Sequence, residues 1–120
     1  MKRIMTIDDS PSLRQMVALT LEGAGYEVVE ACDARDAIAK LAGREYHLFL
    51  TDLNMPGMDG IELTRKIRSL PAYKFVPIVL LTTESQQEKK MQGKAAGATG
   101  WIVKPFQPGD LLATVKRVMR

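Results

Sequence analysis

The chain alternates short apolar runs with longer stretches in which apolar residues recur at helical spacing. Each short run is rich in β-branched or aromatic residues, which is typical of strands buried on both faces of a sheet. The runs cover residues 3–7, 27–31, 46–51, 76–82 and 101–104.

The intervening stretches have the start and stop signals of helices. The first begins at Pro11 and ends near Gly23 and Gly25, and Asp33 is the predicted N-cap of the second. The third covers about residues 61–70, and the fifth has its apolar stripe at Leu111, Leu112, Val115, Val118 and Met119. Five strands, each followed by a helix, predict an α/β fold with one parallel sheet and helices on both of its faces.

The fourth predicted helix, from Ser85 to Ala98, has a thin apolar stripe. Met91 and several alanines are its expected anchors, Met91 being one of the methionines at core-compatible positions, and Gly93 interrupts it. Because such a stripe packs weakly, we expect this helix to form a surface whose position can shift.

Composition limits what the chain can be. With 120 residues, 46% apolar and 26% charged, it has the size and composition of one globular domain, and a sensor, an enzyme and a DNA-binding output module cannot all fit in it. The lone Cys32 cannot form an internal disulfide and is interpreted as an inert small hydrophobe in a reducing compartment. No apolar run approaches a membrane span or a signal peptide, so we expect a cytoplasmic protein.

Polar side chains follow the predicted strands where each strand ends. Asp8 and Asp9 follow the first strand, Asp52 the third, the Thr82–Thr83 pair the fourth, and Lys104 with Pro105 the fifth. Since the carboxyl ends of parallel strands share one edge of the sheet, these groups are expected to meet there. Each alone is explained by a turn or a helix cap. Turns and caps do not explain all of these residues together, because four of the five strand ends have polar or charged side chains that complement one another.

Three neighbouring carboxylates repel one another, and a hard divalent cation such as Mg²⁺ relieves that repulsion. Three aspartates, Mg²⁺ and Lys104 have no net formal charge. Such a site can accept a phosphoryl group, with the metal and the ammonium stabilising the charge of the transition state. Asp52 ends a central strand and is the expected nucleophile.

At this point the chain resembles a response-regulator receiver domain of the stand-alone, CheY-like chemotaxis kind. The resemblance covers Ile4 to about Met119 and rests on Asp8-Asp9, Asp52, Thr82 and Lys104-Pro105-Phe106 in family register, with the stretches 81–85 and 97–106 closest to chemotaxis regulators. It implies a flavodoxin-like (βα)5 fold with strand order 2-1-3-4-5. It also implies a single receiver domain over residues 1–120 without an output domain.

The resemblance also implies residue roles. Asp52 is phosphorylated by a CheA-like histidine kinase or a phosphotransfer domain. Asp9, Asp52 and the backbone carbonyl of Asn54 ligate Mg²⁺, and Asp8 acts mostly through a metal-bound water. Lys104 contacts the phosphoryl group and Thr82 hydrogen-bonds it.

Further implied roles concern tuning and output. Asn54 and Glu84 tune self-dephosphorylation, and the Lys104–Pro105 peptide bond is expected to be cis. Trp101 occupies the place of the switch aromatic, where it either rotates inward or stays half-exposed as a docking surface. The implied output surface consists of the fourth helix, the fifth strand and the fifth helix. It binds a protein target such as a flagellar switch protein, and a phosphatase is a further implied partner. The protein is expected to be a monomer that does not bind nucleic acid or membrane.

His47, the single histidine, is interpreted as a surface or strand-edge residue and not as a ligand. Basic side chains on the last two helices suggest an acidic partner: Lys89, Lys90, Lys94, Lys116, Arg117 and Arg120. The net charge of +3 alone names no partner. One alternative is a phosphate sink or intermediate receiver in another phosphorelay. A second is a flavodoxin-like cofactor binder, which is disfavoured because Asp8 and Asp9 would repel a cofactor phosphate. A nucleic-acid binder and an aspartyl phosphatase lack the expected motifs, so we predict a signalling protein and not an enzyme.

Overall fold

The computed structural model describes residues 1–83 and 87–119. Within them, parallel strands form one sheet in the order β2-β1-β3-β4-β5, which confirms the expected topology. The strands are β1 (Arg3–Ile7), β2 (Glu27–Ala31), β3 (Leu48–Asp52), β4 (Ile78–Thr83) and β5 (Gly100–Lys104).

β3 and β4 begin two residues later than the apolar pattern predicts. Tyr46, before β3, packs its ring on Phe49 and Tyr73 and donates its hydroxyl hydrogen to the Lys40 carbonyl. It therefore belongs to an aromatic cluster in the core on the α2 and α3 face of the sheet. Before β4, Pro77 has no N–H to donate to a neighbouring strand. Apolar residues therefore continue beyond the paired part of both strands.

The helices are α1 (Pro11–Gly23), α2 (Ala34–Leu41), α3 (Gly60–Arg68), α4 (Gln87–Ala96) and α5 (Pro108–Val118), with a short 3-10 helix η1 (Pro71–Tyr73). Asp33 caps α2 as predicted, because its side chain accepts a hydrogen bond from the Asp36 N–H. Ser10 and Asp59 cap α1 and α3 in the same way.

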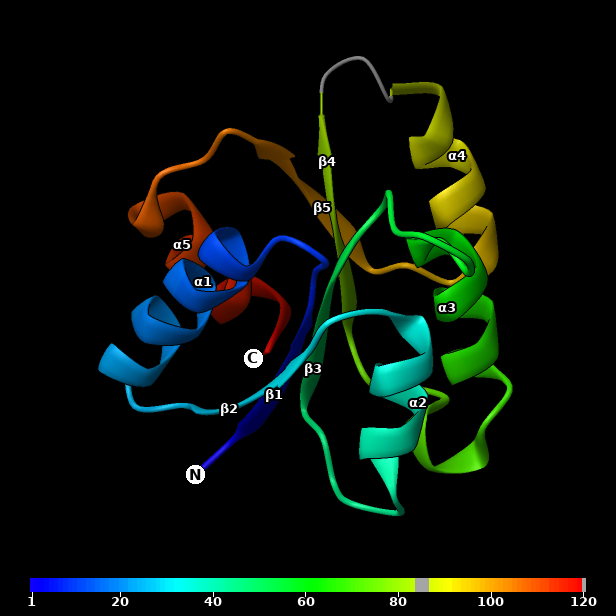
Figure 1. Cartoon of the computed structure of the whole chain (residues 1–120), viewed down its shortest axis with the longest axis horizontal. Helices are drawn as coiled ribbons and strands as arrows, with labels where there is room; N and C mark the ends of the chain where they lie inside the picture. Colours follow the sequence, from blue (N-terminus) through cyan, green and yellow to red (C-terminus); the bar gives the residue numbers. More distant parts are fainter. Residues whose placement is uncertain (84–86, 120) are drawn as a thin grey trace.

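The sheet is the middle of three layers. Figure 1 shows α1 and α5 on one face and α2, α3 and α4 on the other. Alternate residues of each strand supply the two cores: Ile4 and Leu50 pack with α1 and α5, whereas Met5 and Phe49 pack with α2 and α3. Both faces of the central strands are thus covered by helices, which leaves the carboxyl edge of the sheet for polar side chains.

α4 packs on the sheet through small residues. Gly93 and Ala96 are buried, and a Cβ atom on Gly93 would lie 2.5 Å from Leu80 Cδ1. Met91, expected as a core anchor, is 81% exposed, so that prediction is wrong. The close approach of the glycine and alanine face to β4 turns Met91 toward the solvent.

Cys32, expected to be an inert small hydrophobe, is exposed. Partial desolvation of its sulfur by neighbouring atoms, followed by the charges of Asp33 and Asp36, raises the pKa of its thiol. A thiol with a raised pKa reacts slowly, in agreement with the inert role. No helix among the described residues is long and apolar enough to cross a membrane.

Candidate functional site

The first two aspartates and Asp52 come together at the carboxyl edge of the sheet. β1 and β3 are hydrogen-bonded neighbours with Ile7 opposite Thr51, so Asp8 directly follows β1 beside the end of β3. The three side chains offer carboxylate oxygens that all lie within 4.8 Å of one another. The sequence-based expectation that these aspartates meet is confirmed.

Asp8 is the buried member of this acidic cluster. Its Oδ1 accepts a hydrogen bond of 2.8 Å from the Ser10 N–H, whereas its Oδ2 is buried without a hydrogen-bond partner among the described residues. Burial, and next the charge of Asp52, raise the pKa of Asp8 despite the Ser10 hydrogen bond. A buried oxygen without a donor, beside two further carboxylates, fits a hard divalent cation.

Lys104 brings a positive charge to the cluster. It is the last residue of β5, yet its Nζ lies 2.8 Å from Oδ1 of Asp52, which ends β3. Since β4 lies between these strands, the long lysine side chain reaches across one strand. The Lys104–Pro105 peptide bond is cis, as expected.

Thr82 lies on the strand between Asp52 and Lys104. In the β3–β4 register Asp52 is opposite Leu81, so Thr82 is one residue further toward the carboxyl edge. The side chain is 1% exposed, and its Oγ1 has no hydrogen-bond partner among the described residues. A buried hydroxyl without a partner costs free energy, so this group is available to a ligand that enters the site.

Arg14 and Ser10 support the cluster and were not singled out from the sequence. Arg14, on the first turn of α1, donates from Nη1 to the Asp8 carbonyl at 2.6 Å and from Nε to Glu30 Oε1 at 3.2 Å. It therefore ties the end of β1 to the end of β2. The Ser10–Pro11 pair is a recognisable helix start, but the target of the Arg14 side chain becomes visible only in the fold.

An open hollow of about 280 Å³ adjoins the cluster and is lined by Asp9, Asn54, Met55, Pro56 and Asp59. The Asn54 side chain is exposed at its edge. Gly60, the first residue of α3, packs so closely on the end of β3 that a Cβ atom on Gly60 would collide with the Asp52 carbonyl oxygen. The backbone of Asp52 is thus held in place by the start of α3, and Asp9 is the member of the acidic cluster that lines the hollow.

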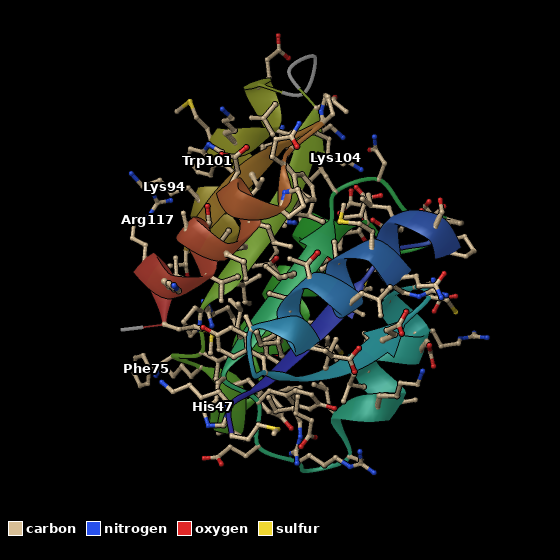
Figure 2. The ribbon with its side chains drawn as sticks, turned by 90° about the vertical axis from the view of Figure 1, so that its left-hand side faces the viewer. His47, Phe75, Lys94, Trp101, Lys104 and Arg117 are labelled. Carbon is tan, nitrogen blue, oxygen red and sulfur yellow. The ribbon has the colours of Figure 1, made fainter. Side chains whose placement is uncertain are left out.

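Trp101 lies on the edge strand β5 and is half-buried, packed against the small cluster of Leu53, Ile61, Leu80 and Ala96. Lys90 of α4 places its Nζ 5.2 Å from the centre of the Trp101 ring, at cation–π distance. Figure 2 shows Trp101 and Lys104 toward the same end of the molecule. Trp101 is not part of the acidic cluster, and Glu84 lies outside the described residues.

Comparison with known proteins identifies the family to which this arrangement belongs. A family model described as "Response regulator receiver domain" matches residues 4–116. The chain belongs to this family. The receiver domain is therefore a signalling module of two-component systems, with the α/β fold that its sequence pattern predicts.

Solved structures and curated relatives agree with this assignment. The receiver domain is similar to the chemotaxis protein CheY4 of Vibrio cholerae, with 51% identity, a TM-score of 0.94 and 98% of both chains covered. It is also similar to the receiver domain of the sensor histidine kinase PA1611 of Pseudomonas aeruginosa, with 27% identity, a TM-score of 0.89, and 98% of this chain and 97% of that chain covered. That structure has a magnesium ion in its active site cleft.

Among curated proteins, the phosphate regulon transcriptional regulatory protein PhoB of Pseudomonas aeruginosa is 40% identical over 119 residues. The match covers 99% of this chain but 52% of that relative, so the chain spans about half the length of the curated protein. The comparisons therefore agree on a receiver domain and include both a chemotaxis protein and a transcriptional regulator.

Proposed function

We propose that this receiver domain accepts a phosphoryl group on the Asp52 carboxylate from a phosphohistidine of a histidine kinase or a phosphotransfer domain. The observation that supports the proposal is the meeting of three carboxylates, the Lys104 ammonium and a buried Thr82 hydroxyl, which has no hydrogen-bond partner in the described part of the chain, at one edge of the sheet. These are the groups that phosphoryl transfer to a carboxylate requires: a nucleophile, a metal site and donors for the transferred oxygens.

Mg²⁺ is the proposed cofactor. Asp9, Asp52 and the backbone carbonyl of Asn54 would hold it, and Asp8 would act through a metal-bound water. The buried Asp8 Oδ2, to which no described residue donates a hydrogen bond, is the observation of this structure that fits such an ion. When bound, Mg²⁺ neutralises charge on the phosphoryl oxygens during transfer.

In the proposed transfer, an Asp52 carboxylate oxygen attacks the phosphorus atom of the donor. The new P–O bond forms as the P–N bond to the histidine breaks, and the electron pair of that bond stays on the imidazole nitrogen. Lys104, already 2.8 Å from Asp52, stabilises the transferred oxygens, and Thr82 donates its hydroxyl hydrogen to one of them. The chain assists its own phosphorylation and dephosphorylation, which Asn54 and Glu84 tune, and is not proposed to turn over another substrate.

The proposed output is a change in the surface formed by α4, β5 and α5. Thr82 lies on β4, which pairs with β5, and Trp101 of β5 packs in one small cluster with Ala96 of α4. Exposed basic side chains on α4 and α5, namely Lys94, Lys116 and Arg117, favour an acidic segment of a partner protein. Trp101 either rotates inward or serves as part of the docking surface. The same positive charges disfavour a two-fold dimer through this face, which supports a monomer.

Chemotaxis is the proposed pathway, with a CheA-like kinase, a flagellar switch protein as target, a phosphatase as a further partner and a cytoplasmic location. The support is the similarity to CheY4, which extends over 98% of both chains. The alternative is a phosphate sink or intermediate receiver in another phosphorelay. The PhoB similarity leaves room for that role.

The experiment incubates the protein with Mg²⁺ and acetyl phosphate or beryllofluoride and follows the fluorescence of Trp101, the single tryptophan of the chain. We expect a saturable, Mg²⁺-dependent change, with one phosphoryl group incorporated from acetyl phosphate and none in Asp52→Asn. Phosphate uptake by Asp52→Asn, or none by the wild type, would contradict the proposal. Binding of phosphorylated protein to a flagellar switch protein would separate motor control from a phosphate sink.

A further inference from the structure

A second surface lies at the end of the molecule opposite the acidic cluster. His47 precedes β3 and Asp52 ends it, so the two are separated by the length of a five-residue strand, about 16 Å. Figure 2 shows His47 and Phe75 at one end of the molecule and Lys104 toward the other. Phosphoryl chemistry at Asp52 therefore does not occur at this surface.

This end of the molecule has an open pocket of about 490 Å³ that is lined by both apolar and polar groups. Its walls come from segments far apart in the sequence: the residues after η1, the start of the chain, and the end of α5. Phe75, Val76, Pro77 and Met119 supply much of the apolar lining, and His47 and Lys2 supply polar groups. A hollow that combines apolar lining with polar groups is typical of ligand and peptide binding sites.

Phe75 is the most informative residue of this pocket. It is 88% exposed, although a phenylalanine of a stable monomer normally finds cover. Its neighbours Tyr46 and Tyr73 are almost fully buried, so the fold has an aromatic cluster nearby that Phe75 does not join. A large exposed aromatic side chain beside a pocket is typical of an interface anchor.

Two lysines lie at the edge of the pocket. Lys74 holds its Nζ 5.6 Å from the centre of the Phe75 ring, and Lys2 lines the pocket with its Nζ 3.3 Å from the Met119 carbonyl oxygen. Glu45, whose Oε1 lies 3.6 Å from His47 Nε2, offsets part of this charge. The pocket thus has apolar side chains in its centre and a lysine at each of two sides of its rim.

We propose that this pocket, here called the Phe75 pocket, binds an acidic segment of a partner protein that inserts an aromatic or aliphatic side chain next to Phe75. Charge complementarity decides between this occupant and a second copy of the chain. In a two-fold dimer each Lys2 and Lys74 would face the same basic rim of the other copy, whereas carboxylates of an acidic segment pair with both lysines. Since the pocket lies at the far edge of the sheet, binding there is independent of phosphorylation.

The test selects peptides from a phage-displayed library of random 12-residue sequences on the immobilised full chain. We expect enriched peptides with at least two acidic residues and one large apolar residue, and Phe75→Ser lowers their affinity by about tenfold or more. Because Phe75 is so exposed, this variant is expected to fold normally, which circular dichroism checks. Lys74→Glu weakens the same peptides, and added salt weakens them in the wild type.

The matched control is Met91→Ser, which removes an exposed apolar side chain on α4 and leaves these affinities unchanged. Asp52→Asn and beryllofluoride also leave them unchanged, so this inference and the proposed phosphorylation fail or succeed separately. Peptides that are not acidic, peptides insensitive to Phe75→Ser, or a library without enrichment would overturn the proposal. A Phe75-dependent dimer in sedimentation would assign the pocket to a second copy instead.

Discussion

Lys104 Nζ and Asp52 Oδ1 lie 2.8 Å apart, although the two residues are 52 positions apart in the sequence and end strands that are not neighbours in the sheet. This ion pair partly neutralises a site in which three carboxylates meet. It also means that any cation entering the site does so beside a fixed ammonium group, with consequences for metal affinity and for stability.

Replacing Lys104 is expected to strengthen Mg²⁺ binding while impairing phosphoryl transfer. In Lys104→Met the ammonium no longer repels the divalent cation, and the Mg²⁺ dissociation constant should fall about fivefold or more. Isothermal titration calorimetry measures that constant, and acetyl phosphate uptake measures the loss of transfer. Lys94→Met, at an exposed position of α4, is the control and should change neither. Weaker Mg²⁺ binding by Lys104→Met would contradict the role of its charge.

Asp8→Asn is expected to stabilise the Mg²⁺-free protein at neutral pH. Burial raises the pKa of Asp8 above that of an unfolded chain, so the ionised carboxylate weakens the folded state at high pH and this penalty disappears as the pH falls through the folded pKa. The variant should have a higher free energy of unfolding than the wild type at pH 7, and this gain should vanish near pH 3.

Urea denaturation at both pH values, with and without Mg²⁺, measures this effect. Mg²⁺ should stabilise the wild type more than Asp8→Asn, because the variant lacks one carboxylate. An equal gain at pH 3 and pH 7 would show that the side-chain charge is not the cause.

Arg14→Met is expected to weaken Mg²⁺ binding although Arg14 is not a proposed ligand. The variant loses the hydrogen bonds to the Asp8 carbonyl and to Glu30, and the loop that presents Asp8 and Asp9 is then less fixed. Losing such outer supports typically lowers metal affinity by about tenfold. Arg65→Met, at an exposed position of α3, is the control. An unchanged Mg²⁺ affinity in Arg14→Met would remove Arg14 from the site.

Two glycine substitutions of the same chemical size are expected to have opposite effects. Gly60→Ala places a Cβ atom against the Asp52 carbonyl oxygen and 3.1 Å from Leu53 Cα, and should lower the free energy of unfolding by about 2 kcal/mol or more. Gly109→Ala, near the start of α5, meets nothing within 4 Å and should raise it by about 0.5 kcal/mol. Chemical denaturation of both variants checks this, and a neutral Gly60→Ala would mean that α3 moves away from β3 easily.

The sequence predicts the fold and the acidic cluster for the same reason. Hydrophobic period identifies strands and helices, and parallel strands must bring their carboxyl ends to one edge, so Asp8 and Asp52 can be placed together without coordinates. The family register supplied the strand order, which apolar pattern alone does not determine.

What the sequence could not predict depends on side-chain direction and on how closely two elements approach. Met91 has helical spacing suitable for a core, yet the approach of Gly93 to Leu80 turns Met91 outward. The two hydrogen bonds of Arg14 likewise exist only once α1 is docked beside β1 and β2. Phe75 follows a short 3-10 helix, where no periodicity indicates which side chains are covered.

The glycine and alanine face of α4 has a thermodynamic consequence. Burial of two small residues removes little apolar surface from water, and each leucine-sized side chain absent from that face leaves out about 2 kcal/mol of stabilisation. Reversing a strongly biased two-state equilibrium takes about 5.5 kcal/mol, an amount that a few new hydrogen bonds to a phosphoryl group can approach. Because α4 packs weakly, phosphorylation of Asp52 can supply enough free energy to reposition it. With a larger apolar stripe on α4, the same phosphorylation would not supply enough free energy to move the helix.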